Sequence, residues 1–463
     1  MLASSPDPTW RLSAAELAAA YAKGQLDPVL VLRAVLERLQ AVQPHIRAVV
    51  SMDESAALAA AQASAARWKR AAPLSPLDGV PLTVKDNIPV AGLPCQWGSR
   101  LFRDHRPARD ESPVRRLRAA GAVIVGKTNV PEFTLQGYCD NALHGATHNP
   151  WRPGLTPGGS SGGAVAAVAA GVGPLALGTD GGGSIRRPCA LTGLVGLKPS
   201  WGLVARTDGL PEILPGMEVV GPIARTTGDL RRMMVVLAPG GGFDAAASAS
   251  SRKQRILHWR TLAGRPVDPE VTRSVNDAAQ ALRAMGHDVV EAEAPAAVDT
   301  FNREAWPVIA ATGLAAVLRP HSAQTGELSP ALARMLADGL GLRAVDLFDA
   351  RQCVRRLRTA IAACLEDADL ILTPSSAALA WPAHQTHPTH IDGQAVDARG
   401  HALFTAFVNA TGLPALNLPA RASASGLPIG FQLVGRAGSD AALCALGADF
   451  EAQQPWRDRW PAL

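Results

Sequence analysis

Short apolar runs alternate with helix-like segments from about residue 80 onward, and this alternation constrains the fold more than any other feature. Val80–Val84 and Ala122–Val125 have the length and composition of buried strands. Further strands are expected at 175–177, 194–195, 370–372 and 431–434, and helices at 112–120 and 163–170. Because strands that alternate with helices form layered structures, we expect an α/β fold with a mainly parallel or mixed sheet.

The N-terminal part is expected to be helical. The motif Ser13-Ala-Ala-Glu16 is a capping box, and Asp27-Pro28 places an N-cap residue before a proline suited to a first helical turn. Apolar side chains then recur one turn apart from Leu32 to Leu39, and an Ala-rich helix is expected at about 54–68. Residues 1–70 are therefore predicted to form a helical part.

The segment after residue 238 has a different character. Pro239–Ser251 is rich in Gly, Ala and Ser, which favours a loop or an internal boundary. The region 272–365 is expected to be mostly helical. Because the late apolar runs are expected to rejoin the first sheet, we predict a single domain, 1–463, with a mostly helical insert at 240–366.

Composition limits the class of protein. The chain has 463 residues, of which 47% are hydrophobic, so it can bury a large core and is not a disordered chain. Its net charge of +5 (45 basic against 40 acidic residues) is spread without a basic run. We therefore expect no nucleic-acid partner and no membrane partner.

Cysteine usage and the first residues bear on the compartment. The six cysteines form no C-x-x-C pair and are too few for a disulfide framework, which favours a reducing compartment. Met1–Trp10 has neither a basic start nor an apolar run, so no secretory signal is expected. Gly162–Gly178 is the longest apolar stretch and falls short of the ~20 residues of a spanning helix. A cytoplasmic location is expected.

Two loops rich in glycine and serine carry the strongest chemical signal. They are Pro157–Gly163 and Gly178–Pro188. Glycine allows backbone N–H groups to approach a ligand closely, so such loops can hold a phosphate or an oxyanion. Turns that serve only the topology are the alternative. Two such loops within 30 residues, each with serine, make that alternative weaker.

Other glycine motifs fit less well. A phosphate-binding P-loop fails because Gly163 is followed by Ala164 rather than Lys. Gly240–Ala245 matches a dinucleotide fingerprint loosely but does not follow a strand. Gly158–Gly162 has the letters of a nucleophile elbow, yet a turn-rich segment precedes it where an elbow requires a strand.

A serine nucleophile needs a base, and Lys85 is the candidate. It ends the apolar run Gly79–Lys85 in a chain that otherwise uses arginine far more than lysine. Burial at a strand end lowers the pKa of a lysine and lets it act as a neutral base. The alternative is a lysine whose amine reaches solvent from the strand end.

Taken together, these segments resemble the amidase signature family. The resemblance is carried by Gly79–Asp86, the Pro157–Gly163 loop and Gly178–Arg186, with a serine separation of 184 − 160 = 24. Supporting matches are Gly126–Phe133, Asn149–Trp151, Gly193–Ser200, Gly221–Arg225, Thr411–Ala415 and Gly426–Gly435. The segment 240–366 matches poorly. The resemblance implies a large mixed central sheet covered by helices on both faces.

The resemblance also implies roles for single residues. Ser184 would be the nucleophile, Lys85 the base and Ser160 the bridge between them, held by a cis peptide bond. The N–H groups of Gly181, Gly182, Gly183 and Ser184 would form the oxyanion hole, although many relatives have Thr or Ile where Gly181 stands. Burial, the helix start near Ser161 and the charges of Arg186 and Arg187 would keep Lys85 neutral.

Supporting and substrate-binding residues follow in the same way. Ser161 would join the hydrogen-bond network or cap a helix, Asp180 would orient the loop, and Arg186 would be structural. Arg187 would bind a substrate carboxylate or pair with a surface acid. Tyr138, Cys139 and Asn141 would line the substrate pocket, and Phe301 and Trp306 would close it or pack in the core.

One cluster suggests a metal without a suitable scaffold. His384, His387 and His390 recur every third residue, but Pro382 and Pro388 forbid a regular helix. A surface loop is expected rather than a zinc site. No metal and no cofactor is therefore predicted.

The implied function is hydrolysis of a carboxylic amide C–N bond through an acyl-serine intermediate. The products would be a carboxylate and ammonia or an amine, and the expected partners are a small-molecule amide and a second copy in a homodimer. The alternatives are the A-type subunit of a tRNA-dependent amidotransferase and a binding protein without activity. Retention of all three triad positions weighs against the last.

Overall fold

A mixed sheet crosses the molecule. The computed structural model describes residues 8–244 and 252–463. The strands are β1 (Val49–Ser51), β2 (Pro81–Lys85), β3 (Val123–Thr128), β4 (Leu175–Asp180), β5 (Val195–Lys198), β6 (Val219–Ala224), β7 (Arg255–His258), β8 (Asp288–Glu291), β9 (Leu370–Pro374), β12 (Ala415–Pro419) and β13 (Gly430–Gly435). Within the described residues these eleven strands form one sheet in the order β1-β3-β2-β4-β6-β5-β12-β13-β9-β7-β8.

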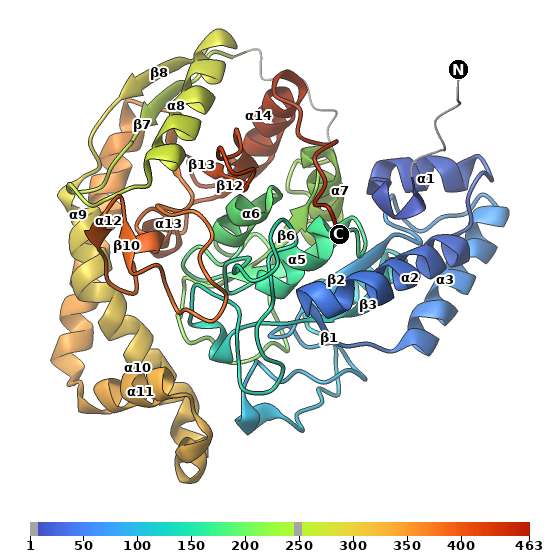
Figure 1. Ribbon diagram of the computed structural model, residues 1–463, viewed down its shortest axis with the longest axis horizontal. Coiled ribbons are helices and arrows are strands. Elements are labelled where there is room, and N and C mark those ends of the chain that lie inside the picture. The colour runs from blue at the N-terminus through green and yellow to red at the C-terminus, as the bar shows by residue number, and fades with distance from the viewer. Residues whose placement is uncertain (1–7, 245–251) are drawn as a thin grey trace.

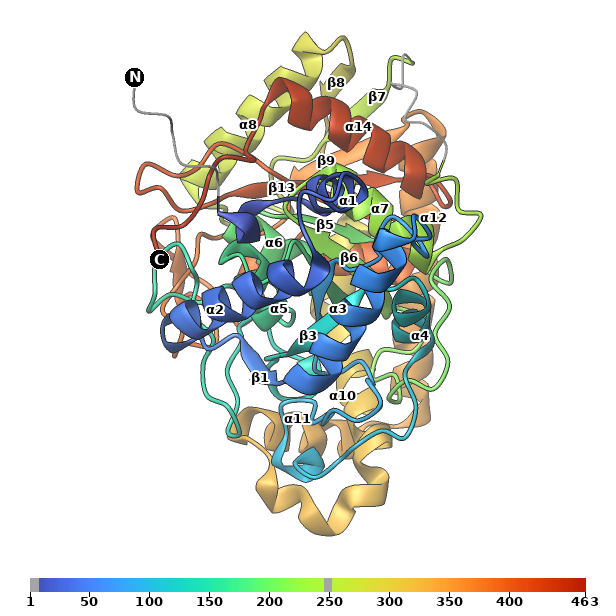
Figure 2. The same cartoon turned by 90° about the vertical axis from the view of Figure 1, so that its right-hand side faces the viewer.

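Helices cover both faces of this sheet, as predicted (Figures 1 and 2). They are α1 (Ala14–Ala22), α2 (Pro28–Ile46), α3 (Glu54–Lys69), α4 (Ser112–Ala119), α5 (Gly162–Ala169), α6 (Arg186–Thr192), α7 (Thr227–Leu237), α8 (Pro269–Ala284), α9 (Ala296–Thr300), α10 (Trp306–Leu318), α11 (Pro330–Gly341), α12 (Ala344–Glu366), α13 (Ala406–Thr411) and α14 (Asp440–Gln453). A small pair, β10 (His390–Ile391) and β11 (Gln394–Ala395), lies apart from the sheet.

The side-chain alternation of β4 shows how two helical layers share the sheet. Ala176 packs with α5 and α6, whereas Leu175 and Leu177 belong to the apolar cluster that includes α7. Successive side chains of a strand point to opposite faces, so one strand serves both layers. All residues of β2, β3, β4 and β6 are buried. Burial on both faces explains why these strands are continuous apolar runs in the sequence.

The N-terminal helices begin where the sequence predicts. Ser13 and Glu16 form a complete capping box at α1, and the Asp27 side chain caps α2. The third helix runs from Glu54 to Lys69. The short strand β1 pairs with β3, so this part also contributes one edge strand to the sheet.

The segment 240–366 is helical over most of its length but also adds two strands. Strand β7 pairs with β8 and with β9 in parallel, which extends the sheet at the edge opposite β1. The prediction of a mostly helical insert therefore missed the two strands, β7 and β8, that this segment adds to the sheet. The expected loop at 239–251 is irregular as far as Asp244, and the rest of it lies outside the described residues.

Two sequence alternatives can be compared with this fold. The helix α7, rather than a strand, precedes Gly240, which excludes a dinucleotide-binding turn there. Across residues 8–244 and 252–463, no helix combines the length and apolar character needed to cross a membrane.

Candidate active site

Parallel pairing of β2 with β4 places Lys85 beside Thr179. Both strands end at the same edge of the sheet, with Val84 opposite Leu177. The Lys85 amine donates to Thr179 Oγ1 at 2.7 Å and to the Thr179 carbonyl at 3.1 Å, and it reaches Ser160 Oγ at 2.9 Å. The side chain is fully buried. The strand end thus brings one amine to a hydroxyl of the loop 157–163.

Burial is the main reason why the pKa of Lys85 falls to about 7. Asp180 and Glu218 oppose the fall, because nearby carboxylates favour the charged amine. Arg206 is a cation that adds to the fall. The expected burial effect is present, but the expected contributions of Arg186 and Arg187 to the Lys85 pKa are not among the causes.

The loop 157–163 presents Ser160 with a cis peptide bond between Gly159 and Ser160. A Cβ at Gly159 would overlap the carbonyl of Tyr138, so this position requires glycine. Isolated bridges and turns, rather than a strand, precede the loop, which excludes a nucleophile elbow at Ser160. Ser160 is 1% exposed and faces the Lys85 amine.

Ser161 joins the network rather than capping a helix. Its hydroxyl donates to the Thr179 carbonyl at 3.2 Å, and α5 has no side-chain cap. Its backbone N–H donates to the Ser184 carbonyl at 3.1 Å. Ser161 therefore connects the two glycine-serine loops.

Asp180 orders the second loop, as expected. Its carboxylate accepts from the N–H groups of Gly183 at 2.6 Å and Ile185 at 3.1 Å. Burial alone would raise the pKa of Asp180, but the charge and hydrogen bonds of Arg186 hold it below its usual range. The N–H of Gly183 is thus engaged by Asp180. This corrects the prediction that all four residues from Gly181 to Ser184 offer free donors.

Arg186 forms a buried network of hydrogen bonds and an ion pair, which is compatible with the structural role proposed from the sequence. Its guanidinium is fully buried and pairs with Asp180 at 3.0 Å. It also donates to Gln432 Oε1 at 2.8 Å, to the Thr405 carbonyl at 3.1 Å and to Asn409 Oδ1 at 2.6 Å. These bonds tie the Ser184 loop to β13 and α13, which lie more than 200 residues away in the sequence.

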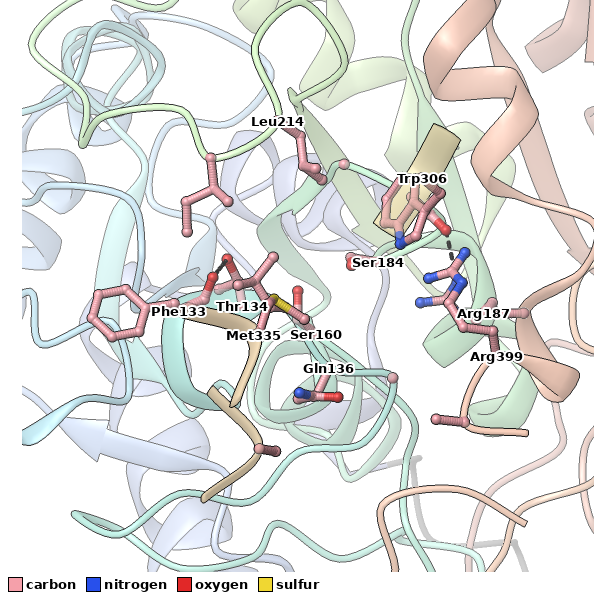
Figure 3. Close-up of a pocket in the computed structure, with 18 of the residues that line it drawn as sticks. Phe133, Thr134, Gln136, Ser160, Ser184, Arg187, Leu214, Trp306, Met335 and Arg399 are labelled. Atoms are coloured by element: carbon pink, nitrogen blue, oxygen red, sulfur yellow. Dashed lines mark hydrogen bonds between the residues drawn. The ribbon is translucent and has the colours of Figure 1, made fainter. Parts of the chain in front are cut away.

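A cavity of about 350 Å³ opens onto Ser160 and Ser184 (Figure 3). Thr179, Gly181 and Gly182 also line it. The remaining lining comes from Arg187, 133–137, 213–218, Trp306, 331–335 and 386–402. The segments that surround the two serines thus come from both halves of the chain.

Three predicted pocket residues lie outside this lining. Asn141 donates to Asn129 and Val130, Cys139 packs against Gly162, and Tyr138 contributes its carbonyl beside Gly159. Their role is to hold the loops, so the prediction that they line the pocket is wrong. The preceding segment 133–137 lines the cavity instead.

Of the remaining candidate residues, some line the cavity and others do not. Trp306 lines the cavity, and its ring lies where a Cβ at Gly182 would be, whereas Phe301 is buried behind it. His387 also lines the cavity, while His384 and His390 are exposed. Over the described ranges, no three His, Cys, Asp or Glu side chains converge as metal ligands would.

Thr179 and Arg399 are functional candidates that the sequence analysis missed. Thr179 stands inside the motif Gly178–Arg186, and only the parallel register shows that it contacts Lys85. Arg399 follows no recognisable motif and reaches the cavity through the fold alone.

The comparisons agree with this geometry. A family model described as Amidase matches residues 30–444. The chain belongs to the Amidase family. An acylamidase of Rhodococcus erythropolis is 35% identical, with 97% of each chain covered. The A-type subunit of the glutamyl-tRNA(Gln) amidotransferase of Chloroflexus aggregans is also 35% identical, over 96% of each.

Solved structures of the family have the same fold. A bacterial aryl acylamidase of the amidase signature family superposes with a TM-score of 0.89 at 27% identity, covering 97% of this chain and 98% of its own. A 6-aminohexanoate cyclic dimer hydrolase superposes with a TM-score of 0.85 at 27% identity, covering 98% and 99%. Membership in the Amidase family makes the protein an amide-hydrolysing enzyme, as the sequence indicated.

Proposed function

We propose that the protein hydrolyses small carboxylic amides through an acyl-serine intermediate on Ser184, acting without a partner protein. The observation that supports this most is the buried Lys85 amine, 2.9 Å from Ser160 Oγ, in a cavity that also exposes Ser184. An amine with a pKa of about 7 is a competent base near neutral pH. A serine hydroxyl becomes a good nucleophile only when a neighbour takes its proton.

In the proposed reaction, Ser160 takes the proton of Ser184 as it gives its own to Lys85. Ser184 Oγ bonds to the amide carbon, and the carbonyl electrons form an oxyanion. The N–H groups of Gly181, Gly182 and Ser184 donate to that oxyanion. The C–N bond then breaks, and the nitrogen leaves with the proton returned from Lys85 through Ser160.

Water completes the cycle along the same path. It loses a proton through Ser160 to Lys85 and attacks the acyl ester, and Ser184 recovers a proton as the carboxylate departs. Among the described residues, no hydrogen bond joins the hydroxyls of Ser160 and Ser184. We expect that bond to form when substrate fills the cavity, because catalytic hydrogen bonds often tighten only in the complex.

The role of an A-type amidotransferase subunit is a second candidate function. The relative in Chloroflexus aggregans supports it as strongly in identity as the acylamidase does. Such a protein would use the same serines and lysine to release ammonia from an amide. The two functions differ in whether the lone chain turns over simple amides.

The test measures ammonia released by the purified protein from acetamide, butyramide, benzamide and glutamine. Turnover of a simple amide, with hydroxamate formed when hydroxylamine is added, is expected, since an acyl-enzyme partitions between nucleophiles. Turnover of glutamine alone, and only after a partner protein is added, would favour the amidotransferase. Amide hydrolysis that never yields hydroxamate would contradict the acyl-serine step.

A further inference from the structure

Arg187 is a buried cation that faces the cavity without an acidic partner. Its side chain is 4% exposed, and one amino group donates to the Gly182 carbonyl at 2.6 Å and to Thr405 Oγ1 at 3.1 Å. Throughout residues 8–244 and 252–463, its Nε has no hydrogen-bond partner and no carboxylate forms an ion pair with it. The predicted alternative of a surface acid is therefore not realised.

Arg399 is a second such cation in the same cavity. Its guanidinium stacks on Trp306, with its central carbon 4.4 Å from the ring centre. Its Nε and one terminal nitrogen are buried, and neither has a hydrogen-bond partner among the described residues. Asp397 stands nearby, but its carboxylate accepts from the Arg399 backbone N–H and pairs with Arg265 at 3.2 Å. Ring stacking fixes the orientation of the Arg399 guanidinium and leaves these N–H groups unused.

The two guanidinium groups lie side by side next to Ser184 and Trp306 (Figure 3). Burial and the neighbouring Arg399 charge lower the pKa of Arg187 to about 9, and burial lowers the pKa of Arg399 to about 10. Both groups therefore stay cationic at neutral pH. Burying two like charges whose N–H donors have no partner is unfavourable in free energy, and an anion bound between them offsets this penalty.

The acidic group in the lining is already occupied. Glu218 accepts from the N–H groups of Ile213 and Leu214 at 3.0 Å, and Arg206 approaches it at 3.6 Å. Glu218 packs beside Gly181, whereas Arg187 packs beside Gly183, and no ion pair joins Glu218 to either Arg187 or Arg399 among the described residues. It does not neutralise the two arginines.

We propose that the cavity selects amides that carry a carboxylate, which Arg187 and Arg399 bind while the amide carbonyl meets Ser184. This inference rests on the proposed amidase function and adds its substrate class. A guanidinium presents parallel N–H donors that match the two oxygens of a carboxylate, and charge-assisted bonds of this kind are strong and directional. The unused donors of both arginines are of the required type.

Arg399 offers the cleaner test of the two. Arg187 holds the Gly182 carbonyl, so replacing it would disturb the serine loop as well as the charge. In the part of the chain that the structure describes, no hydrogen bond of the Arg399 side chain holds that loop. Arg399→Gln removes the charge, Arg399→Lys keeps it without the planar fork, and Arg260→Gln removes an exposed charge that pairs with Glu291 at the distant sheet edge.

The experiment compares kcat/KM for amides matched in size. Succinamate is paired with 4-methylpentanamide, which tests a carboxylate on the acyl side, and N-acetylglycine with N-isobutylacetamide, which tests the amine side. In one of the two pairs we expect the anionic amide to be preferred by about 10- to 100-fold, the size of charged hydrogen bonds. Arg399→Gln should abolish that preference, Arg399→Lys should restore part of it, and Arg260→Gln should leave it intact.

Calorimetric binding of succinate and glutarate separates this inference from the proposed function. Ser184→Ala and the unmodified chain should bind one of these dicarboxylates, and Arg399→Gln should not. If anionic and neutral amides are hydrolysed equally well and no dicarboxylate binds, the proposed carboxylate site is wrong, whereas the proposed amidase function is retained. If no amide is hydrolysed but a dicarboxylate binds and Arg399→Gln abolishes this binding, the proposed amidase function is wrong, whereas the carboxylate site is retained.

Discussion

The two walls of the cavity differ in how completely their polar groups are bonded. Ser160, Thr179 and Ser184 line the cavity, and together with the fully buried Lys85 and Asp180 they form what we term the serine wall. Short hydrogen bonds between buried groups join Lys85 to Ser160 and Thr179, and Asp180 to the Ser184 loop. The second group of lining residues, which we term the arginine wall, consists of Arg187, Trp306, Met335, His387, Arg399 and His401.

The arginine wall retains unpartnered polar atoms. Both ring nitrogens of His401 and two nitrogens of Arg399 lack partners within the described residues, although these atoms are buried. Burial, followed by the charges of Arg187 and Arg399, holds the pKa of His401 well below its usual range, so the ring is neutral. The difference indicates that Lys85, Ser160 and Thr179 are already bonded to one another before substrate arrives, whereas the buried nitrogens of the arginine wall gain partners only from the substrate.

Replacing Ser184 by Ala should have the largest effect. It removes the atom that bonds to substrate, so we expect amide hydrolysis to fall by about 10⁶-fold, as in a serine hydrolase without its nucleophile. Mass spectrometry after treatment with a fluorophosphonate should find the adduct on Ser184 in the unmodified chain. An adduct on Ser160 would reverse the assignment of the two serines.

Replacing Lys85 by Arg should be nearly as severe, because arginine stays protonated and cannot accept the proton. We expect a loss of about 10⁴-fold or more, the upper range for general base catalysis. Because burial lowers the Lys85 pKa to about 7, the neutral base is lost below that pH. The rate of the unmodified enzyme should therefore rise with pH up to about 7 and then level.

Circular dichroism of Lys85→Arg and Lys85→Met provides the control for folding. A rate that continues to rise between about pH 8 and pH 10 would show a lysine with an ordinary pKa. That profile would contradict the proposal that burial lowers the pKa of Lys85 and so makes it a neutral base near pH 7.

Ser160→Ala should be milder than either change. It removes the relay but leaves the nucleophile and the oxyanion donors, so a loss of about 10²- to 10⁴-fold is expected. The variant should still accept the fluorophosphonate on Ser184, at a reduced rate that stopped-flow labelling would measure. Labelling at the unmodified rate would mean that Lys85 reaches Ser184 without Ser160.

Arg186 and Arg187 are neighbours that should respond differently in stability. Arg186→Met leaves Asp180 buried and unpaired, which should lower the free energy of unfolding by about 3–5 kcal/mol. Arg187→Met should cost less than about 1.5 kcal/mol, because Thr405 still donates to the Gly182 carbonyl. Urea unfolding monitored by tryptophan fluorescence compares the two, and equal losses would show that the Arg186–Asp180 pair adds no more to stability than the contacts of Arg187.

Features with local causes could be predicted from the sequence. The capping box at Ser13, the cap at Asp27 and the apolar strand that ends at Lys85 each depend on a few adjacent residues, and all are found where expected. The members of the serine wall other than Thr179 were named from the sequence for a similar reason. These residues lie in short motifs that share neighbouring strand ends.

The sequence pointed to Trp306 and Arg187 as pocket residues, but the rest of the arginine wall could not be predicted, because its members come from separate segments that only the fold assembles. No motif in the sequence around Arg399 points to a pocket. Tyr138 and Asn141 were predicted to line the cavity, but the segment 133–137, a few residues earlier in the chain, lines it instead. Strands β7 and β8 were missed in the same way. Their runs are short and partly exposed, so the sequence pattern is weak, and only the pairing of β7 with β9 and of β8 with β7 places them in the sheet.

Removal of metal ions should have the smallest effect on either wall. The proposed reaction uses proton transfer and backbone donors, so dialysis against EDTA should leave the rate unchanged. A zinc site would need about three protein ligands at one point, but His384 and His390 are exposed, whereas His387 lines the cavity. Loss of activity on chelation, restored by zinc and abolished in His387→Ala, would show that the arginine wall takes part in the chemistry as well as in selection.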